Sequence, residues 1–465
     1  MLSAALLPLC FPPWGWWPLI LVVLPALILA TTGTTSRRAF YLGMLHGLVG
    51  YGLALHWFFF IFGRAAFPLF AIMALFTGLF CLLNNYFSNR FSSRVLAVLV
   101  TPTLWTAIEF FRSELYFLRF PWITPGTALG PTYLSPILGV YGASFLVLAA
   151  SAALVRRRTL PLAVSLGLGV LVLGLFRPVR LAPVEGLGVA VTVVQSEACV
   201  LPAYAALTAA AVATGSQPDL IVWPEYALPY DVRRSPGDLS ALHEIAAESG
   251  AILIVGTKTV SDGGAGAWHN TALTLDENGI LGEYYKARPV HFFDDGTPGD
   301  HFEPVGTRLG AVGTPICFDF DYSDVPRKLT RAGAEFFAVP TFDAESWSAT
   351  QHLQHAALFR LRAAENARWV ASAASSGVSQ FVDPNGNVHG SLPPMVVGSL
   401  TSEIGRSTHL TFFTRAGWLF PWVTLGGTAL LLVFGFLSLR SRGAEGSRPG
   451  HLLAPRADLG RRARG

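Results

Sequence analysis

Three residues have side chains that together could carry out acyl transfer, and each follows a run that predicts a β-strand. Glu225 follows residues 221–224, Lys286 follows residues 283–285, and Cys317 follows residues 310–316. A thiolate can attack a carbonyl carbon, a carboxylate can take the thiol proton, and an ammonium can stabilise the thiolate and the developing oxyanion. We therefore predict that Glu225, Lys286 and Cys317 are catalytic residues.

Cys317 is predicted to be the nucleophile because of its position in the chain. Residues 310–317 form a short, largely apolar run that predicts a strand ending at the cysteine, and a helical pattern follows over residues 325–333. A helix N-terminus near a thiol favours the reactive thiolate. On this stretch alone, a small buried hydrophobic residue is an equal alternative, since many free cysteines are of that kind. The order and setting of all three residues favour catalysis.

The composition divides the chain into membrane-like and globular parts. Hydrophobic residues make up 52% of the 465 residues and charged residues only 13%, which is about half the charged share of a soluble protein. The apolar excess lies almost entirely in residues 1–176 and 418–439. We therefore predict a membrane protein that carries one soluble domain. The net charge of +4 does not indicate a nucleic-acid partner, because the arginines lie beside the apolar runs.

The apolar runs predict a polytopic α-helical membrane domain. A helix needs about 20 apolar residues to cross a bilayer, and we expect about eight spans, seven before the soluble domain and one after it. The runs are residues 2–11 (short), 19–32, 40–62, 67–87, 95–111, 133–155, 160–176 and 418–439. Residues 1–10 lack the basic region of a cleaved signal peptide. The expected domains are membrane helices over 1–180, a soluble domain over 185–412, a last span over 416–440 and a disordered basic tail over 441–465.

Basic residues between the runs predict the orientation. If every run crosses the membrane, all the arginine clusters fall on one side: Arg37 and Arg38, Arg90 and Arg94, Arg156, Arg157 and Arg158, and those of the tail. Basic loops remain in the cytoplasm. The soluble domain is then expected on the opposite face, which in a bacterium is the periplasm.

The soluble segment alternates predicted strands with predicted helices. Strands are expected over residues 188–195, 219–223, 251–257, 270–276, 282–286, 335–340, 369–374 and 379–382, and helices over 204–214, 239–249, 325–333 and 349–368. Residues 277–279 and 383–386 carry turn signals that predict hairpins. This alternation with interleaved hairpins predicts an α/β sandwich rather than a simple doubly wound sheet.

Two pairs of polar residues have both a functional and a structural interpretation. Glu109 and Arg112 lie one helical turn apart near the outer end of the fifth span, and we favour a local ion pair over a functional site. His352 and His355 have a spacing that can suit a metal, but without a clear third ligand we favour the helix surface. Residues 120–136 are expected to form an interfacial or re-entrant segment.

The cysteines indicate neither a disulfide framework nor a zinc site, and we predict no metal and no cofactor. They are Cys10, Cys81, Cys199 and Cys317. A disulfide between Cys199 and Cys317 would abolish the nucleophile, so Cys199 is predicted to be structural.

The order of Glu225, Lys286 and Cys317 resembles the triad of the carbon–nitrogen hydrolase (nitrilase) superfamily. With the predicted spans, residues 1–440 resemble the bacterial apolipoprotein N-acyltransferase family. The matching features are Phe11-Pro12-Pro13, Glu109 with Arg112, Phe120-Pro121-Trp122, Val140-Tyr141-Gly142, Trp223-Pro224-Glu225, Tyr285-Lys286, Ile316-Cys317, Gln351-His352, and residues 360–366. The resemblance implies a nitrilase-like α-β-β-α sandwich on a polytopic membrane domain.

The resemblance also implies a two-step reaction at the inner membrane. Cys317 would take an acyl chain from a membrane phospholipid, and the α-amine of a diacylglyceryl apolipoprotein would then accept it as an amide. Both substrates are anchored in the lipid bilayer, so a thiol at the bilayer surface avoids extracting acyl chains into water. We expect a monomer. The alternatives are a membrane-tethered amidase, an acyltransferase with another donor or acceptor, and a scaffold or transporter with an inactive domain.

Several positions depart from the family pattern. Phe318 and Asp319 follow the cysteine where the family usually has Tyr and Glu, and Asp294 stands where it usually has a second essential Glu. Tyr204 stands where the family has Trp, and the loop containing Trp347 is of an unusual type. We predict that Asp294 and Asp319 support the site by orienting Lys286 or the acceptor amine, the alternative being turn-forming aspartates. Phe318, Tyr204 and Trp347 are expected to contact substrate.

Overall fold

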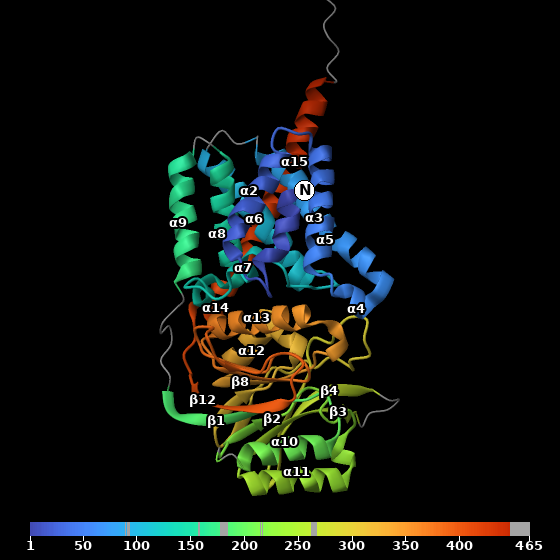
Figure 1. The fold of residues 1–465 in the computed structure, drawn as a ribbon. Helices are drawn as coiled ribbons and strands as arrows, with labels where there is room; N and C mark the ends of the chain where they lie inside the picture. Colours follow the sequence, from blue (N-terminus) through green and yellow to red (C-terminus); the bar gives the residue numbers. More distant parts are fainter. Residues whose placement is uncertain are drawn as a thin grey trace, which may run out of the picture.

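A helical bundle and an α/β sandwich make up the computed structural model, with helix α13 between them (Figure 1). The structure describes residues 1–88, 90, 94–156, 159–176, 185–213, 215, 217–261 and 267–446. Arg157 and Arg158 of the predicted charge cluster and residues 447–465 of the predicted tail lie outside these ranges. The first residues of that tail are helical, because the last helix continues to Gly446.

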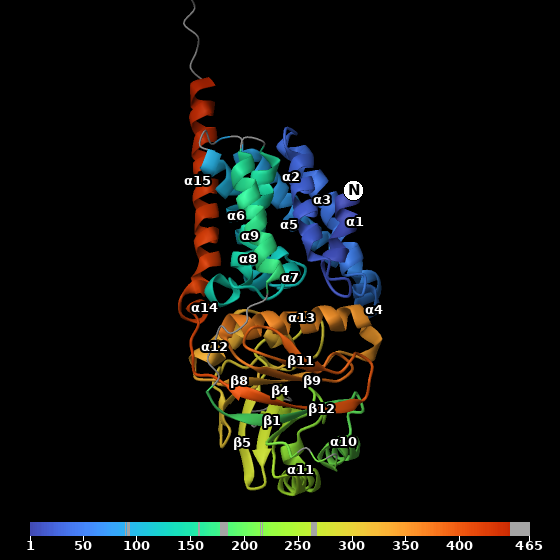
Figure 2. The same ribbon diagram turned by 60° about the vertical axis from the view of Figure 1, so that its left-hand side comes forward.

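The bundle is formed by apolar helices that run side by side, as Figures 1 and 2 both show. Its members are α1 (Leu2–Leu6), α2 (Ile20–Thr31), α3 (Ser36–Ala54), α4 (Phe58–Phe62), α5 (Ala66–Ser88), α6 (Arg94–Phe110), α7 (Pro125–Leu129), α8 (Ser135–Val155), α9 (Leu160–Leu175) and α15 (Phe420–Gly446). The short helix α7 lies in the segment that was expected to be interfacial or re-entrant.

Three helical stretches among the described residues are long and apolar enough to cross a membrane: Phe58–Ser88, Ser135–Val155 and Gly417–Ser438. Trp17–Thr31 and Pro161–Leu175 are apolar but shorter. A helix rises about 1.5 Å per residue, so such helices fall short of a hydrocarbon layer about 30 Å thick. The structure therefore confirms a membrane protein, and the full set of eight spans remains a prediction.

The predicted span over residues 40–62 is wrong at its C-terminal end. Helix α3 ends at Ala54, and α4 begins at Phe58 after a turn. Helix α4 continues through a 3-10 turn, Gly63–Ala65, into α5. Figure 1 shows α4 at the end of the bundle next to the sandwich. Hydropathy did not separate these residues from the span because α4 is as apolar as the helix before it.

The α/β sandwich predicted from the alternation of strands and helices is confirmed, and it contains two six-stranded sheets. One has the order β12-β1-β2-β3-β4-β5 and the other β11-β10-β9-β8-β7-β6. The strands are β1 (Glu185–Gln195), β2 (Leu220–Val222), β3 (Ile252–Val260), β4 (Trp268–Asp276), β5 (Gly279–Tyr285), β6 (Val305–Thr307), β7 (Gly310–Gly313), β8 (Phe336–Thr341), β9 (Val370–Ala374), β10 (Gln380–Val382), β11 (Val388–Ser391) and β12 (Gly398–Arg406).

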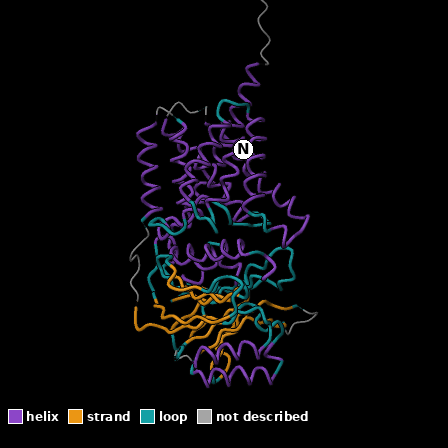
Figure 3. Tube along the Cα trace, in the orientation of Figure 1, coloured by secondary structure: helices purple, strands orange, loops and turns teal. Residues whose placement is uncertain are grey.

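Helices cover the outer face of each sheet, which completes the α-β-β-α order (Figure 3). Helices α10 (Leu201–Ala213) and α11 (Pro236–Ser249) cover the first sheet. Helices α12 (Asp324–Arg331) and α13 (Ala349–Asn366) cover the second, and α13 separates it from the bundle. Strands β2 and β8 are buried throughout, which explains their continuous apolar runs.

Strand β12 was not predicted, although it pairs with β1 over most of its length. Its residues are half-buried and mixed in polarity, so the strand carries neither an apolar run nor a clear alternation. The short strands β6 and β11 escaped prediction for the same reason. Pairing with neighbouring strands, rather than local sequence, fixes these three elements.

Candidate active site

The structure brings Glu225, Lys286 and Cys317 together in a buried position beyond the ends of strands from both sheets. Glu225 follows β2 and Lys286 follows β5 in the first sheet, whereas Cys317 follows β7 in the second. Lys286 Nζ lies 2.8 Å from Glu225 Oε1, and the charges of both residues influence the pKa of Cys317. The exposed fraction is only 2% for Glu225, 1% for Lys286 and 5% for Cys317, so water does not screen the charges of these side chains.

Glu225 has one carboxylate oxygen bound and one available. Oε1 accepts hydrogen bonds from Lys286 Nζ and, at 2.6 Å, from Asn270 Nδ2. Oε2 is buried and has no hydrogen-bond partner among the described residues. Burial raises the pKa of Glu225, against the lowering effect of the Lys286 charge. A buried, basic carboxylate with a free oxygen has the chemistry of a general base.

Lys286 lies between two carboxylates, and the second belongs to Asp295. Asp295 Oδ2 is 2.8 Å from Lys286 Nζ. Asp295 also accepts hydrogen bonds from Tyr226 Oη at 2.5 Å, from Asn270 Nδ2 at 2.7 Å and from the backbone N–H of Val290 at 2.7 Å. Burial lowers the pKa of Lys286, but Asp295 and Glu225 outweigh burial and hold this pKa well above its usual value. Lys286 is therefore a fixed cation.

Cys317 begins the 3-10 turn Cys317–Asp321, with φ at 49°. Strand β7 ends at Gly313, earlier than predicted, and residues 314–316 carry the chain to this turn. A non-glycine residue rarely adopts such a φ, and residues that do are frequent at active sites. The Cys317 thiol donates a hydrogen bond to the Phe342 carbonyl, with 3.6 Å between sulfur and oxygen.

The resting sulfur of Cys317 is a thiol. Burial raises its pKa well above the ordinary value, and the Glu225 charge raises it further, against the lowering effect of Lys286. The sequence instead predicted that a helix N-terminus would favour the thiolate. That helix, α12, starts only at Asp324, and burial dominates. Reaction at this sulfur therefore requires a base within the site.

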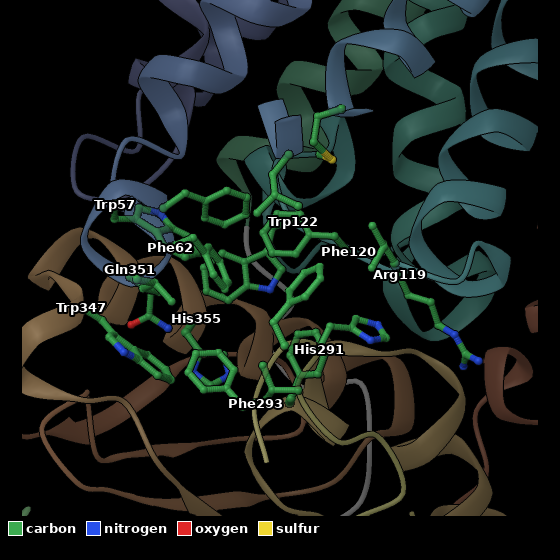
Figure 4. Close-up of a pocket in the computed structure, with 18 of the residues that line it drawn as sticks. Trp57, Phe62, Arg119, Phe120, Trp122, His291, Phe293, Trp347, Gln351 and His355 are labelled. Atoms are coloured by element: carbon green, nitrogen blue, oxygen red, sulfur yellow. The ribbon is translucent and has the colours of Figure 1, made fainter. Parts of the chain in front are cut away.

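Cys317 lines a largely apolar cavity between the bundle and the sandwich (Figure 4). The space between the protein atoms is about 860 Å³, part of it open to the outside. Aromatic side chains come from both parts of the protein: Trp57, Phe58, Phe120 and Trp122 from the bundle, and Phe293, Phe318 and Trp347 from the sandwich. Phe318 and Trp347 thus lie where a substrate bound beside Cys317 would contact them.

The comparisons with known proteins cover both parts of the chain. Residues 3–153 match the apolipoprotein N-acyltransferase N-terminal domain, and residues 190–408 match the carbon–nitrogen hydrolase family. The chain belongs to the apolipoprotein N-acyltransferase family. It is therefore an acyltransferase whose catalytic domain is of the carbon–nitrogen hydrolase type.

Individual relatives support this family assignment along nearly the whole chain. The apolipoprotein N-acyltransferase of Geobacter metallireducens is 26% identical, over 94% of this chain and 94% of its own. That of Pseudomonas aeruginosa is 28% identical, over 95% and 96%. Among solved structures, the carbon–nitrogen hydrolase from Helicobacter pylori G27 is 21% identical and covers 47% of this chain and 89% of its own, with a TM-score of 0.40.

The second carboxylate that contacts Lys286 belongs to Asp295, whereas the sequence favoured its neighbour Asp294. Asp294 is exposed, and Asp295 is buried in the site. The two aspartates are adjacent, so only the conformation of the loop decides which one faces Lys286. The sequence did indicate an acidic residue in this loop, because the family pattern has one eight residues after Lys286, at the position of Asp294.

Asp319 joins the Cys317 turn to the chain that follows Lys286. It is fully buried and accepts hydrogen bonds from the backbone N–H groups of Ile316 at 3.1 Å, Ala287 at 3.3 Å and Arg288 at 2.7 Å. It also accepts one from Tyr284 Oη at 3.0 Å. Burial raises the pKa of Asp319 to about 6. These contacts hold the chain that follows Lys286 against the turn that begins at Cys317.

Tyr204 lies in the core between α10 and the first sheet rather than in the cavity. Its ring stacks on Trp223, with 5.2 Å between the centroids, and its hydroxyl donates to the Ser196 carbonyl at 2.7 Å. These contacts give Tyr204 a structural role, so the predicted substrate contact is not supported by its position. Trp223 precedes Pro224 and Glu225, and the stacking therefore supports the end of β2.

Both histidines of α13 are buried, so their predicted place on the helix surface is wrong. His355 Nδ1 lies 2.9 Å from Asp343 Oδ1, and its Nε2 lies 3.1 Å from Asp321 Oδ1. Burial lowers the pKa of His355, but the two aspartates outweigh burial and raise it to about 10. Helix α13 packs on both the sheet and the bundle, which leaves little of it exposed.

The charged His355 group also connects the sandwich to the bundle. The ring of Trp122, from the bundle, stacks on His355 with 5.6 Å between centroids, and Trp122 Nε1 donates to Asp321 Oδ2 at 2.6 Å. These contacts assign His355 to the junction between the two parts.

No group of three or more His, Cys, Asp or Glu residues within the described ranges could hold a metal ion.

Glu109 and Arg112 form hydrogen bonds with other residues of the bundle instead of forming the predicted pair. Glu109 accepts hydrogen bonds from Ser144 Oγ at 2.8 Å and Trp105 Nε1 at 2.6 Å. Arg112 donates to the carbonyl of Trp122 at 3.1 Å. These contacts hold α6 against α8 and fix the segment that leads into the cavity wall. Cys199 is a free, half-buried thiol.

Proposed function

We propose that the protein transfers an acyl chain from a membrane phospholipid to the N-terminal amine of an S-diacylglyceryl-cysteine lipoprotein. The observation that carries this proposal is the position of Cys317, which lines the apolar cavity beside the bundle and lies within the influence of the Glu225–Lys286 pair. Family membership supports the same reaction. An apolar cavity beside a membrane-embedded bundle suits an acyl chain that must leave a bilayer.

In the first step, the sulfur of Cys317 attacks the carbonyl carbon of the donor ester while Glu225 Oε2 takes the thiol proton. Lys286 stabilises the oxyanion of the tetrahedral intermediate. The carbon–oxygen bond to the glycerol then breaks, and the leaving oxygen takes the proton from Glu225. The products are a lysophospholipid and a thioester on Cys317, with Glu225 again ionised.

In the second step, the neutral amine of the acceptor attacks the thioester carbon. Glu225 takes a proton from the attacking nitrogen, the carbon–sulfur bond breaks, and the sulfur takes this proton to regenerate the thiol. The product is an amide. Aromatic side chains around Cys317 limit the access of water, which favours transfer over hydrolysis of the thioester.

We further propose eight spans in the bacterial inner membrane, with the sandwich in the periplasm. The C-terminal ends of α2 and α8 and the N-terminal ends of α3 and α9 lie at the end of the bundle away from the sandwich (Figure 1). Arg37 and Arg38 begin α3, and Arg156 follows α8. Basic residues at this end support a cytoplasmic location for it. The sandwich then lies on the same side as the lipid-anchored acceptor.

The test combines the purified full-length protein, phospholipid vesicles and a synthetic diacylated lipopeptide with a free N-terminus. We expect the lipopeptide to gain the mass of one acyl chain, and Cys317→Ala to abolish this gain. Release of free fatty acid without acylated lipopeptide would instead support a membrane-tethered hydrolase. Acyl transfer at the wild-type rate by Cys317→Ala would contradict the proposed mechanism.

A further inference from the structure

Arg119 is a charged residue in the wall of an otherwise largely aromatic cavity. It lies between the turn of the bundle at Phe111–Leu115 and Trp122, and it is half-buried. Figure 4 shows Arg119 and His291 on one side of the cavity, opposite Trp347 and Gln351. Arg119 comes from the bundle and His291 from the loop after Lys286, so both parts of the protein contribute to this side.

The guanidinium of Arg119 has no hydrogen bond, ion pair or ring contact with the residues that the structure describes. Only its backbone is engaged, since the Arg119 carbonyl accepts a hydrogen bond from Tyr322 Oη at 3.3 Å. Two other arginines differ in this respect, because their guanidinium groups have protein partners: Arg288 pairs with Asp324 at 2.6 Å, and Arg112 donates to the Trp122 carbonyl. A half-buried guanidinium without a protein partner is unfavourable unless a ligand or water satisfies it.

His291 provides a second group at the same side of the cavity. Burial lowers the pKa of His291, and the positive charge of Arg119 lowers it further. The imidazole is therefore neutral at pH 7 and can donate one N–H. A guanidinium and a neutral N–H donor on the same side of a cavity match a phosphodiester, which offers two oxygens that share one negative charge to the planar guanidinium and a further acceptor to the imidazole.

We propose that Arg119 binds the phosphate of the acyl donor and so selects phosphate-bearing esters over neutral ones. This assignment rests on the proposed function. Cys317 and Arg119 line the same cavity, so a donor that presents its ester to the sulfur can place its phosphate against the guanidinium. Arg119 is half-buried, so water screens this contact less than it would at a fully exposed site. Arg119 is thus a specificity-determining residue.

The test measures the first half-reaction alone. The full-length protein in detergent micelles, without acceptor, is mixed with phosphatidylglycerol or with diacylglycerol of the same chains, and the thioacyl adduct on Cys317 is followed by intact-protein mass spectrometry. For Arg119→Gln, we expect the half-saturating phosphatidylglycerol concentration to rise roughly tenfold or more, because a hydrogen-bonded ion pair is lost. The values for diacylglycerol and the maximal rate should remain unchanged.

Arg119→Lys should recover part of the phosphatidylglycerol affinity, since it restores the charge but not the planar pair of donors. Arg331→Gln is the matched control, because Arg331 is an exposed arginine at the end of α12. It should behave as wild type with both donors.

Three outcomes would overturn the assignment. Equal losses with both donors would show that Arg119 is only structural, and no loss with either would show that it binds no donor group. Arg119-dependent inhibition by inorganic phosphate would assign the site to free phosphate rather than a lipid headgroup. A failure of the proposed function would give a different result, because the wild-type protein would then form no thioacyl adduct from either donor.

Discussion

Replacing Glu225 with glutamine preserves the size of the side chain but removes its negative charge and, with it, the proposed ability to accept the thiol proton. The structure indicates that this change does not collapse the site. Lys286 keeps its contact with Asp295 at 2.8 Å, and the glutamine oxygen can still accept the hydrogen bonds of Lys286 and Asn270. The expected defect is therefore chemical, and the melting temperature of the variant should stay close to that of wild type.

The size of the defect follows from the protonation of Cys317. A positioned general base contributes roughly a hundredfold to ten-thousandfold, so Glu225→Gln should lose activity by about that factor at pH 7. The Glu225 charge raises the pKa of Cys317, and Lys286 lowers it. Without that carboxylate the thiol should ionise at lower pH than in wild type. The rate of the variant should therefore rise with pH as the thiolate forms directly.

The assay is single-turnover formation of the thioacyl adduct between pH 6 and pH 10, followed by mass spectrometry. Alkylation of Cys317 by iodoacetamide over the same range reports the ionisation of the sulfur independently of substrate. Glu277→Gln is the matched control, because Glu277 lies exposed in the turn between β4 and β5. Activity within tenfold of wild type at pH 7, or an alkylation midpoint above that of wild type, would refute the assignment of Glu225 as base.

Three further predictions test the surroundings of this base. Cys317→Ala should eliminate the thioacyl adduct while leaving detergent-extracted protein monodisperse, and a remaining adduct would place the nucleophile elsewhere. Asp295→Asn should slow adduct formation at least about tenfold because it removes a charge-assisted hydrogen bond to Lys286. Asp294→Asn should match wild type, and a larger loss in Asp294→Asn than in Asp295→Asn would contradict the structure. The pKa of His355 is raised from 6.5 to about 10, so its contribution to stability is complete below pH 6.5 and is lost as the pH rises toward 10. The melting temperature of wild type should therefore fall from pH 7 to pH 10, and this fall should be smaller in His355→Gln. An equal fall in both proteins would argue against a charged His355.

Tertiary packing decided how each polar group within the site is used. Adjacent aspartates 294 and 295 are equivalent in sequence, and one loop conformation turns only Asp295 toward Lys286. The sequence favoured a position on the helix surface for His352 and His355, but α13 packs on both the second sheet and the bundle, so both side chains are buried. The thiol state of Cys317 depends on burial and on the charges around it, and both are sums over residues from several elements.

The division into membrane helices and an α/β sandwich could be predicted from the amino-acid sequence alone, as could the positions of Glu225, Lys286 and Cys317 after strands. These features are local: apolar runs, turn signals and the residue that follows a strand can be read without knowledge of the partners. Strand β12, the break between α3 and α4, and the free oxygen of Glu225 could not be predicted in this way. Each depends on which distant segment packs against it, and only the folded chain fixes those contacts.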